Sequence, residues 1–211
     1  TSEILTLFRD DQLFPPFIYR TVRMKGITGC TYQLTVETRG RIITASTTIP
    51  EPPIVNGLSM EAESDSSGNL TVSVQPSQNE DLRLFLQTKS KLADQNFHPV
   101  KMPVIKVPAG ETAQKINIDR MYETNLYLID TKRNYYKDWD RYSYSLKDTV
   151  MVKVGTIDMK SYQVFKSLYA DQSNQLNPFA FNTGGIQTNI VGGIGRWTGI
   201  GLAPLKIYYG E

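Results

Sequence analysis

The sequence predicts a mainly β protein, in which antiparallel strands form a β-sandwich and one α-helix lies near the C-terminus. Short segments with alternating apolar residues recur along the chain and are separated by turn residues, which is typical of a sandwich. Twelve tyrosines, with abundant threonine, valine and isoleucine, favour strands over helices. One segment near the C-terminus has its apolar residues at helical spacing instead.

The first fifty residues are predicted to contain strands that end in a β-hairpin. Cys30, Tyr32, Leu34 and Val36 alternate with polar residues, and a second alternating run carries Ile43, Ala45, Thr47 and Ile49. The dipeptide Arg39–Gly40 lies between the two runs and provides the turn. We therefore expect residues 1–50 to be the terminal strands of a first, truncated sandwich.

Three prolines, Pro50, Pro52 and Pro53, follow this hairpin and indicate a domain boundary. Residues 51–211 then form the main β-sandwich region, of the immunoglobulin or fibronectin type. Its strands are predicted from alternating apolar residues, at Leu70, Val72 and Val74, at Leu82, Leu84 and Leu86, at Val150, Val152 and Val154, and at Leu205, Ile207 and Tyr209. Residues 101–110 (KMPVIKVPAG) contain two prolines, so they fit an edge strand.

The helix is predicted over about residues 158–171. Asp158 is placed to cap the free N–H groups of its first turn. Tyr162, Phe165, Leu168 and Tyr169 share one face of the helix, and that face should pack against the sheet. Pro178 prevents the helix from continuing beyond the polar residues that follow it.

The single cysteine, Cys30, excludes an internal disulfide bond. Its position in phase with Tyr32 predicts a buried packing residue, because a free cysteine normally behaves as a small apolar side chain. We therefore expect Cys30 to resist thiol reagents in the folded protein.

Composition and motifs argue against several chemistries. The net charge of +2 predicts no nucleic-acid partner, and no apolar run is long enough for a transmembrane segment. The only histidine, His98, excludes zinc sites built on histidine pairs and is expected in a solvated loop. The glycines near Gly193 lack a nucleotide-binding pattern and predict turns. We expect no catalytic residues, no metal and no cofactor.

Residues 134–144 (NYYKDWDRYSY) form the most suggestive local segment. It interleaves five aromatic residues with charges, and these five are the candidate ligand-binding residues: Tyr135, Tyr136, Trp139, Tyr142 and Tyr144. Such mixtures stack on sugars or contact protein partners. The alternative is a long hairpin loop whose rings pack on the sandwich. If the segment is extended, its side chains alternate between two faces, and we expect Tyr135 and Trp139 to be the exposed pair.

Three motifs together resemble a large family of uncharacterised Bacteroidetes lipoproteins that is catalogued as a domain of unknown function. The motifs are TYxLxV followed by AxTxIP over residues 29–50, a VxV strand leading into a helix over residues 150–168, and NPF…NIxGGIG followed by an aromatic residue over residues 177–197. The resemblance implies an extracytoplasmic protein, in the periplasm or on the outer-membrane surface, with a possible lipid anchor on the natural precursor. It implies no established activity.

Three function hypotheses follow. The first is a non-catalytic binding or accessory module of an envelope nutrient-uptake system, with a glycan, peptide or protein partner. The second is a structural subunit of the fimbrial or adhesin type, which an unpaired edge strand would favour. The third is a hydrolase that uses a carboxylate pair from Glu61, Glu63 and Asp65 or from Asp138 and Asp140.

Overall fold

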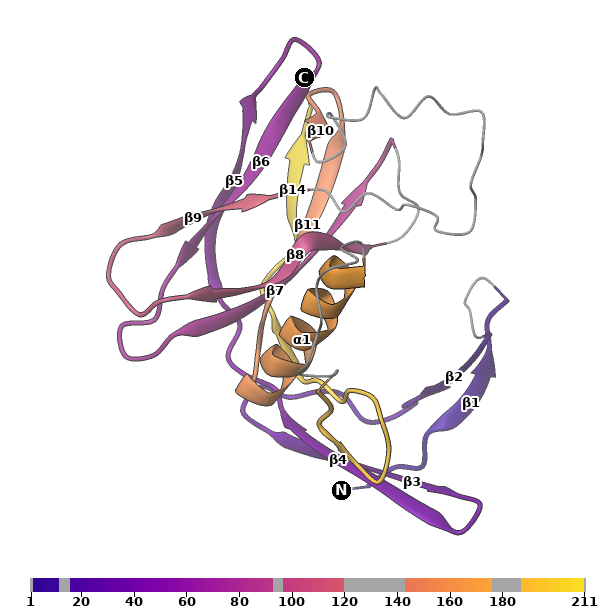
Figure 1. Ribbon diagram of the computed structural model, residues 1–211. Helices are drawn as coiled ribbons and strands as arrows, with labels where there is room; N and C mark the ends of the chain where they lie inside the picture. Colours follow the sequence, from indigo (N-terminus) through magenta and orange to yellow (C-terminus); the bar gives the residue numbers. More distant parts are fainter. Residues whose placement is uncertain (1, 12–15, 93–96, 120–142, 176–186, 211) are drawn as a thin grey trace.

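The computed structural model describes residues 2–11, 16–92, 97–119, 143–175 and 187–210 (Figure 1). It shows a mainly antiparallel β protein with two facing sheets and one helix, which confirms the predicted fold class. Two further groups of strands, one of two and one of three, lie beside the sandwich.

The first sheet of the sandwich is built around a long hairpin. Strand β5 (Ile54–Ala62) pairs antiparallel with β6 (Ser67–Gln75), and residues 63–66 connect them. The opposite edge of β6 pairs with β9 (Gln114–Ile118) and with the short β10 (Tyr144–Ser145).

The second sheet is assembled from segments that are far apart in the chain. Its order is β13 (Ile200–Leu202), β11 (Thr149–Ile157), β7 (Leu82–Ser90) and β8 (His98–Val107), with β14 (Lys206–Tyr209) also paired to β11. Strand β8 is an edge strand, as its prolines predicted.

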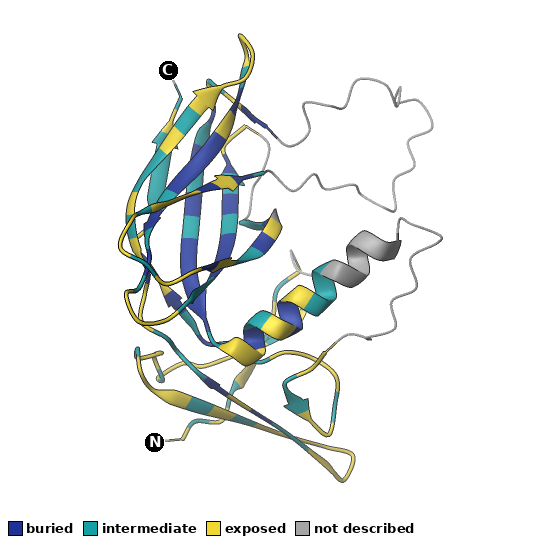
Figure 2. Ribbon diagram, turned by 60° about the vertical axis from the view of Figure 1, so that its left-hand side comes forward, coloured by how far each residue is buried: buried dark blue, intermediate teal, exposed yellow. Residues whose placement is uncertain are grey.

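The core lies between these two sheets, where Figure 2 shows the buried residues concentrated. Each sheet contributes every second residue of its strands to the core. These apolar side chains all point inward, because successive side chains on a strand alternate between the two faces of the sheet. The core cluster contains Leu70, Val72, Val74, Ile116, Ile118 and Tyr144 from the first sheet, and Leu84, Leu86, Val100, Val107, Val150, Val152 and Val154 from the second. The predicted inward phases of β6, β7 and β11 are therefore confirmed.

Helix α1 (Met159–Gln175) packs on the outer face of the second sheet. Asp158 caps it as predicted, because its Oδ1 accepts a hydrogen bond from the Ser161 N–H at 2.7 Å. Phe165 is buried against Phe85 of β7, with ring centroids 4.7 Å apart. Tyr162, Leu168 and Tyr169 are half-buried, and the two tyrosines pack around this contact, so the predicted face is the one that packs.

The N-terminal residues form two hairpins. Strand β1 (Thr6–Arg9) pairs with β2 (Phe17–Arg20), and β3 (Thr31–Thr38) pairs with β4 (Arg41–Thr48) in an unbroken register. The short strand β12 (Ile190–Val191) adds to β4, so the three-stranded sheet joins segments on either side of the boundary proposed at residue 50. Figure 1 shows β1 and β2 extending away from the sandwich.

The structure corrects the burial of Cys30. This residue is exposed, although Tyr32 and Leu34 are half-buried in the predicted phase. Cys30 lies just before β3, where the chain turns: its N–H bonds the Ile27 carbonyl at 3.2 Å. Alternation correctly predicted the face on which Cys30 lies, but no element in the described part of the chain covers that end of the face.

Cys30 should therefore react with a thiol reagent at a similar rate in native and unfolded protein. The measurement is the labelling rate followed by mass spectrometry, with and without denaturant. Protection by more than about a hundredfold in native conditions, equivalent to an opening cost of about 2.7 kcal/mol, would contradict the exposure seen here.

Two further side chains differ from expectation. His98 lies in β8 opposite Thr88 and is half-buried, rather than in a solvated loop. In β14, Tyr208 contacts the core while Tyr209 is exposed, because directly paired residues share a face and Tyr208 is opposite the buried Val150. The predicted phase of Leu205, Ile207 and Tyr209 was correct, but this set faces outward.

Candidate interaction surface

The aromatic segment chosen from the sequence is placed only at its end. Tyr135, Tyr136, Trp139 and Tyr142 lie outside the described residues. Tyr144 is 1% exposed in the sandwich core, and its hydroxyl donates to Thr88 Oγ1 at 3.1 Å. Tyr144 is thus a packing residue with a satisfied hydroxyl, and this corrects its assignment as a ligand-binding residue.

Exposed large apolar residues concentrate in a different part of the molecule. Among the described residues, more than half of them belong to the N-terminal hairpins, their connections and the segment around β12. They are Ile4, Leu7, Phe17, Tyr19, Val22, Ile27, Val36, Ile42, Val191 and Ile194. A group of exposed apolar side chains of this kind marks a protein interaction surface more often than expected by chance.

The β1–β2 ribbon presents one face with the side chains that interfaces enrich. Leu7 is directly opposite Tyr19, and Arg9 is directly opposite Phe17, so these four side chains share a face. The three apolar ones are 50% to 66% exposed. We call the set Leu7, Arg9, Phe17 and Tyr19 the ribbon face. On the opposite face, the Arg20 guanidinium lies 4.5 Å from the centroid of the Phe8 ring.

The ribbon is anchored at its base by Glu3. The Glu3 carboxylate accepts hydrogen bonds from the backbone N–H groups of Val22, Arg23 and Met24 at 2.7, 3.0 and 2.7 Å. These bonds stabilise the charged carboxylate, so the pKa of Glu3 is lowered, with the Val22 bond as the largest cause. A two-stranded ribbon is marginal by itself, and this anchor helps to order it.

The Glu3 anchor should weaken in acid. A carboxylate whose pKa is lower in the folded state contributes stability above its unfolded pKa, near 4.5, and loses that contribution as the pH falls through the folded pKa. NMR titration of the Val22 and Met24 amides should show a transition below pH 4.5. In Glu3→Gln, the same amides should show no such transition. An unchanged titration in this variant would refute the assignment.

The three-stranded sheet is held to the sandwich by Thr47. Its Oγ1, in a side chain 5% exposed, donates to Asp158 Oδ2 at 2.8 Å and accepts from the Gly199 N–H at 2.7 Å. A Cβ at Gly199 would lie 2.7 Å from the Thr48 carbonyl oxygen, so only glycine permits this close approach. The C-terminal glycines thus serve backbone contacts and turns, as their pattern predicted; Gly192 also has a positive φ of 81°.

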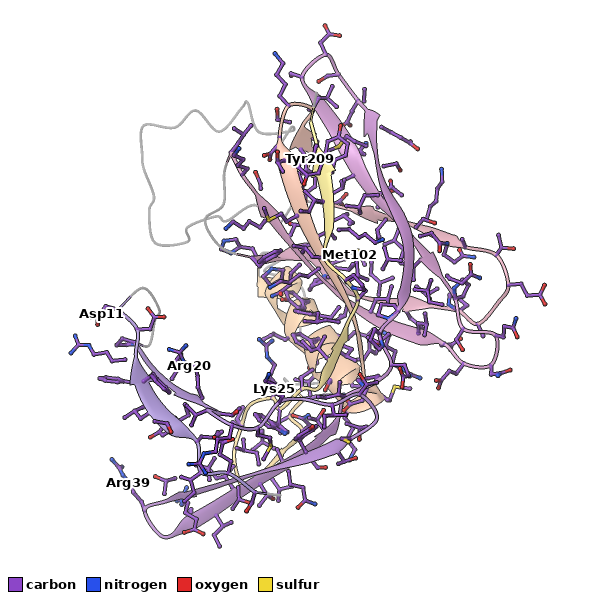
Figure 3. The ribbon with its side chains drawn as sticks, turned by 180° about the vertical axis from the view of Figure 1, so that it is seen from behind. Asp11, Arg20, Lys25, Arg39, Met102 and Tyr209 are labelled. Atoms are coloured by element: carbon purple, nitrogen blue, oxygen red, sulfur yellow. The ribbon has the colours of Figure 1, made fainter. Side chains whose placement is uncertain are left out.

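An open depression of about 690 Å³ lies at the end of the β3–β4 hairpin. It is lined by Thr38, Arg39, Arg41, Ile43, Gly192 and Gly193. Figure 3 shows Arg39 at the hairpin tip, remote from the sandwich. The two guanidinium groups make this depression cationic and suited to a carboxylate.

The carboxylates of the hydrolase hypothesis that the structure describes line neither of the two depressions. Glu61, Glu63 and Asp65 are exposed where β5 turns into β6, and Asp138 and Asp140 lie outside the described residues. The second depression, of about 330 Å³ beside α1, is lined by Lys160, Gln163, Val164 and residues 187–191, without a carboxylate. Within the described ranges, no group of three or more His, Cys, Asp or Glu side chains could hold a metal.

Asp148 is a buried carboxylate with a structural role. It is 2% exposed and bonds the Ser90 hydroxyl and the Leu92 N–H, the latter at 3.1 Å. The serine hydroxyl donates directly to the Asp148 carboxylate. This pair fixes the end of β7 to the start of β11.

Sequence reasoning did not identify the ribbon face. The signal available was a pair of short apolar runs, residues 4–8 and 17–19, separated by prolines. Such runs are equally typical of buried strands, so the sequence does not indicate that these side chains are exposed. The structure shows that β1 and β2 pair only with each other among the described strands, and that Leu7, Phe17 and Tyr19 are exposed.

A family model described as "Domain of unknown function (DUF4249)" matches residues 7–200. The chain belongs to this family. The match includes both N-terminal hairpins, the sandwich strands through β11, helix α1 and the segment around β12. The ribbon face and the cationic depression are therefore parts of the DUF4249 region. Searches of curated proteins and of solved structures gave no significant match.

No helix in the described portion of the chain combines the length and apolar character needed to cross a membrane. The helix α1 has polar residues on its exposed side, including Gln163 and Lys166. Its apolar side is used for packing on the second sheet.

Proposed function

We propose that this chain is a non-catalytic, extracytoplasmic binding module of an envelope nutrient-uptake system, and that it contacts a protein partner through the ribbon face. The extracytoplasmic location, in the periplasm or on the outer-membrane surface, is supported by the resemblance of its motifs to envelope lipoproteins. The protein partner is supported by the surface chemistry of the N-terminal hairpins.

The exposed ribbon face is the observation that carries this proposal. Phe17 and Tyr19 are 54% and 66% exposed on a two-stranded ribbon, beside Arg9. Aromatic residues and arginine dominate the binding energy of protein interfaces, and a partner would bury rings that water now surrounds. Tyr144, the member of the aromatic segment that the structure describes, is buried and is not available to stack on a glycan.

The test is capture of native envelope proteins by immobilised wild type, Tyr19→Ala and Tyr209→Ala, read by quantitative mass spectrometry. The two tyrosines are closely matched at 66% and 69% exposure, but Tyr209 lies on the sandwich. We expect Tyr19→Ala to lose about 2 kcal/mol or more of binding free energy, and Tyr209→Ala to keep wild-type capture. Equal capture by both variants would exclude the ribbon face as the contact.

A structural subunit of the fimbrial or adhesin type is the second candidate. The observation that favours it is the edge of β3, which within the described ranges pairs with β4 on one side only. Fibres of this kind grow when a strand from one subunit completes the sheet of another. Purified protein would then form regular polymers at increasing concentration, whereas a binding module would remain a discrete species in sedimentation.

A further inference from the structure

Among the described strands, none pairs with the outer edge of β3, so this edge is available to an added strand. In the three-stranded sheet the order is β12, β4, β3, so β3 is an edge strand of eight residues. It has a regular register from Thr31 to Thr38 and contains no proline. Edge strands of this length and regularity are templates for pairing with another extended chain.

The turn of the hairpin fixes which backbone groups point outward. Arg39 and Gly40 have φ angles of 47° and 73°, which is typical of a two-residue type I′ turn, and its closing pair is Thr38 with Arg41. A closing pair of this kind is hydrogen-bonded, and bonded pairs alternate along an antiparallel ladder. The outward N–H and C=O groups therefore belong to Thr31, Gln33, Thr35 and Glu37.

Other long edges in the described structure are protected. Strand β8 carries Pro99 and Pro103 and has a register irregularity opposite Phe85–Gln87. Strand β5 is irregular between Val55 and Gly57, and β14 lies close to it. Prolines, bulges and covering elements are the usual means of blocking strand addition. In β3, Glu37 is the only charged residue, so this edge lacks equivalent protection.

The surroundings of β3 indicate the chemistry of the occupant. Tyr32, Leu34 and Val36 line one face, with Val36 40% exposed, which suits apolar side chains at alternate positions of an added strand. At the hairpin end, Arg39 and Arg41 line the cationic depression and suit an acidic residue. An eight-residue edge spans only about 26 Å. A rigid partner that contacts only this edge buries less surface area than a stable interface requires. A flexible peptide also lies along the adjoining face of the sheet and therefore buries more.

We propose that the β3 edge binds an extended segment of the protein partner by strand addition, with an acidic residue of that segment beside Arg39 and Arg41. This inference rests on the proposed function and identifies the form in which the partner is held. The added strand bonds Thr31, Gln33, Thr35 and Glu37, and its alternate apolar side chains cover Leu34 and Val36.

The probes are synthetic eight-residue peptides that alternate valine and threonine, with aspartate at the amino end or at the carboxyl end. Two control peptides replace aspartate with lysine or carry N-methyl groups on alternate amides. Binding to the full chain is measured by NMR, together with hydrogen exchange of the β3 amides. We expect an aspartate peptide to protect the four outward amides and the N-methyl peptide to protect none. The lysine peptide should bind about tenfold more weakly, equivalent to about 1.4 kcal/mol.

A protein variant supplies the matched test. Thr35→Pro removes an outward N–H while leaving the bonds to β4, so it should fold, with binding weakened about tenfold by the loss of one hydrogen bond. Thr35→Val retains the N–H and should bind as wild type does. Equal binding by Thr35→Pro and Thr35→Val would overturn the proposal, as would protection of the same amides by a second copy of the chain alone. Loss of capture in Tyr19→Ala with unchanged capture in Thr35→Pro would reject strand addition while leaving the ribbon-face contact in place.

Discussion

Replacing Phe165 with alanine should lower the free energy of unfolding by about 3–5 kcal/mol, the usual cost of deleting a buried aromatic ring. Phe165 is 3% exposed, and it is the centre of the contact between α1 and the outer face of the second sheet. Its ring meets Phe85 at 4.7 Å and Tyr169 at 6.4 Å, and the Arg196 guanidinium lies 4.4 Å from its centroid. The variant loses all three ring contacts and leaves a cavity under the helix.

Thermal unfolding followed by circular dichroism measures this effect. For a chain of this size the expected loss corresponds to a Tm decrease of roughly 6–20 °C. Lys166→Ala is the control, because Lys166 is the exposed neighbour on the same helix and alanine is a good helix former. If Phe165→Ala and Lys166→Ala melt at the same temperature, α1 is not held by this contact.

Replacing Thr47 with valine should cost about 1–3 kcal/mol. Valine keeps the shape and β propensity of threonine but removes the hydroxyl that joins β4, Asp158 and Gly199. The buried Gly199 N–H then has no acceptor, and the Asp158 carboxylate retains only its capping bond to Ser161. The missing hydroxyl removes the hydrogen bonds that connect the three-stranded sheet to the start of α1. The segments before and after residue 50 are therefore destabilised together.

Hydrogen exchange at the Gly199 and Ser161 amides, with chemical denaturation, measures this change. Thr44→Val is the matched control on the same strand, since the described structure gives the Thr44 hydroxyl no hydrogen bond. Thr47→Ser keeps a hydroxyl and should recover most of the stability. A Thr47→Val protein as stable as Thr44→Val would show that this hydroxyl does not join the two parts.

The strands of the sandwich were predictable because their local pattern and their burial agree. Leu70, Val72 and Val74 alternate in the sequence and are fully buried in the structure. The β3–β4 hairpin was predictable for a similar reason, since Arg39–Gly40 forms a turn and both flanking runs alternate. The cap at Asp158 follows from a local interaction within one turn of the helix.

The candidate interaction surface was not predictable in this way. Periodicity states which side chains share a face of a strand, but it does not state whether another layer covers that face. Cys30 and Tyr209 were both assigned to a correct phase, and both proved exposed because no element in the described structure packs over them. Tyr144 illustrates the opposite case, since a residue in a polar aromatic segment is buried through the pairing of β10 with β6.

The sequence by itself determined the strand phases, the turn at Arg39–Gly40, the helix and its cap, because each depends on residues close together in the chain. The tertiary structure alone decided that Ile190–Val191 pairs with β4, that Thr47 joins Asp158 to Gly199, and that β3 remains an edge. The β12–β4 pairing and the two bonds of Thr47 link residues more than a hundred positions apart. Their selection depends on which packing of the whole chain buries the most apolar surface and satisfies the most backbone groups, and no local window of sequence contains that information.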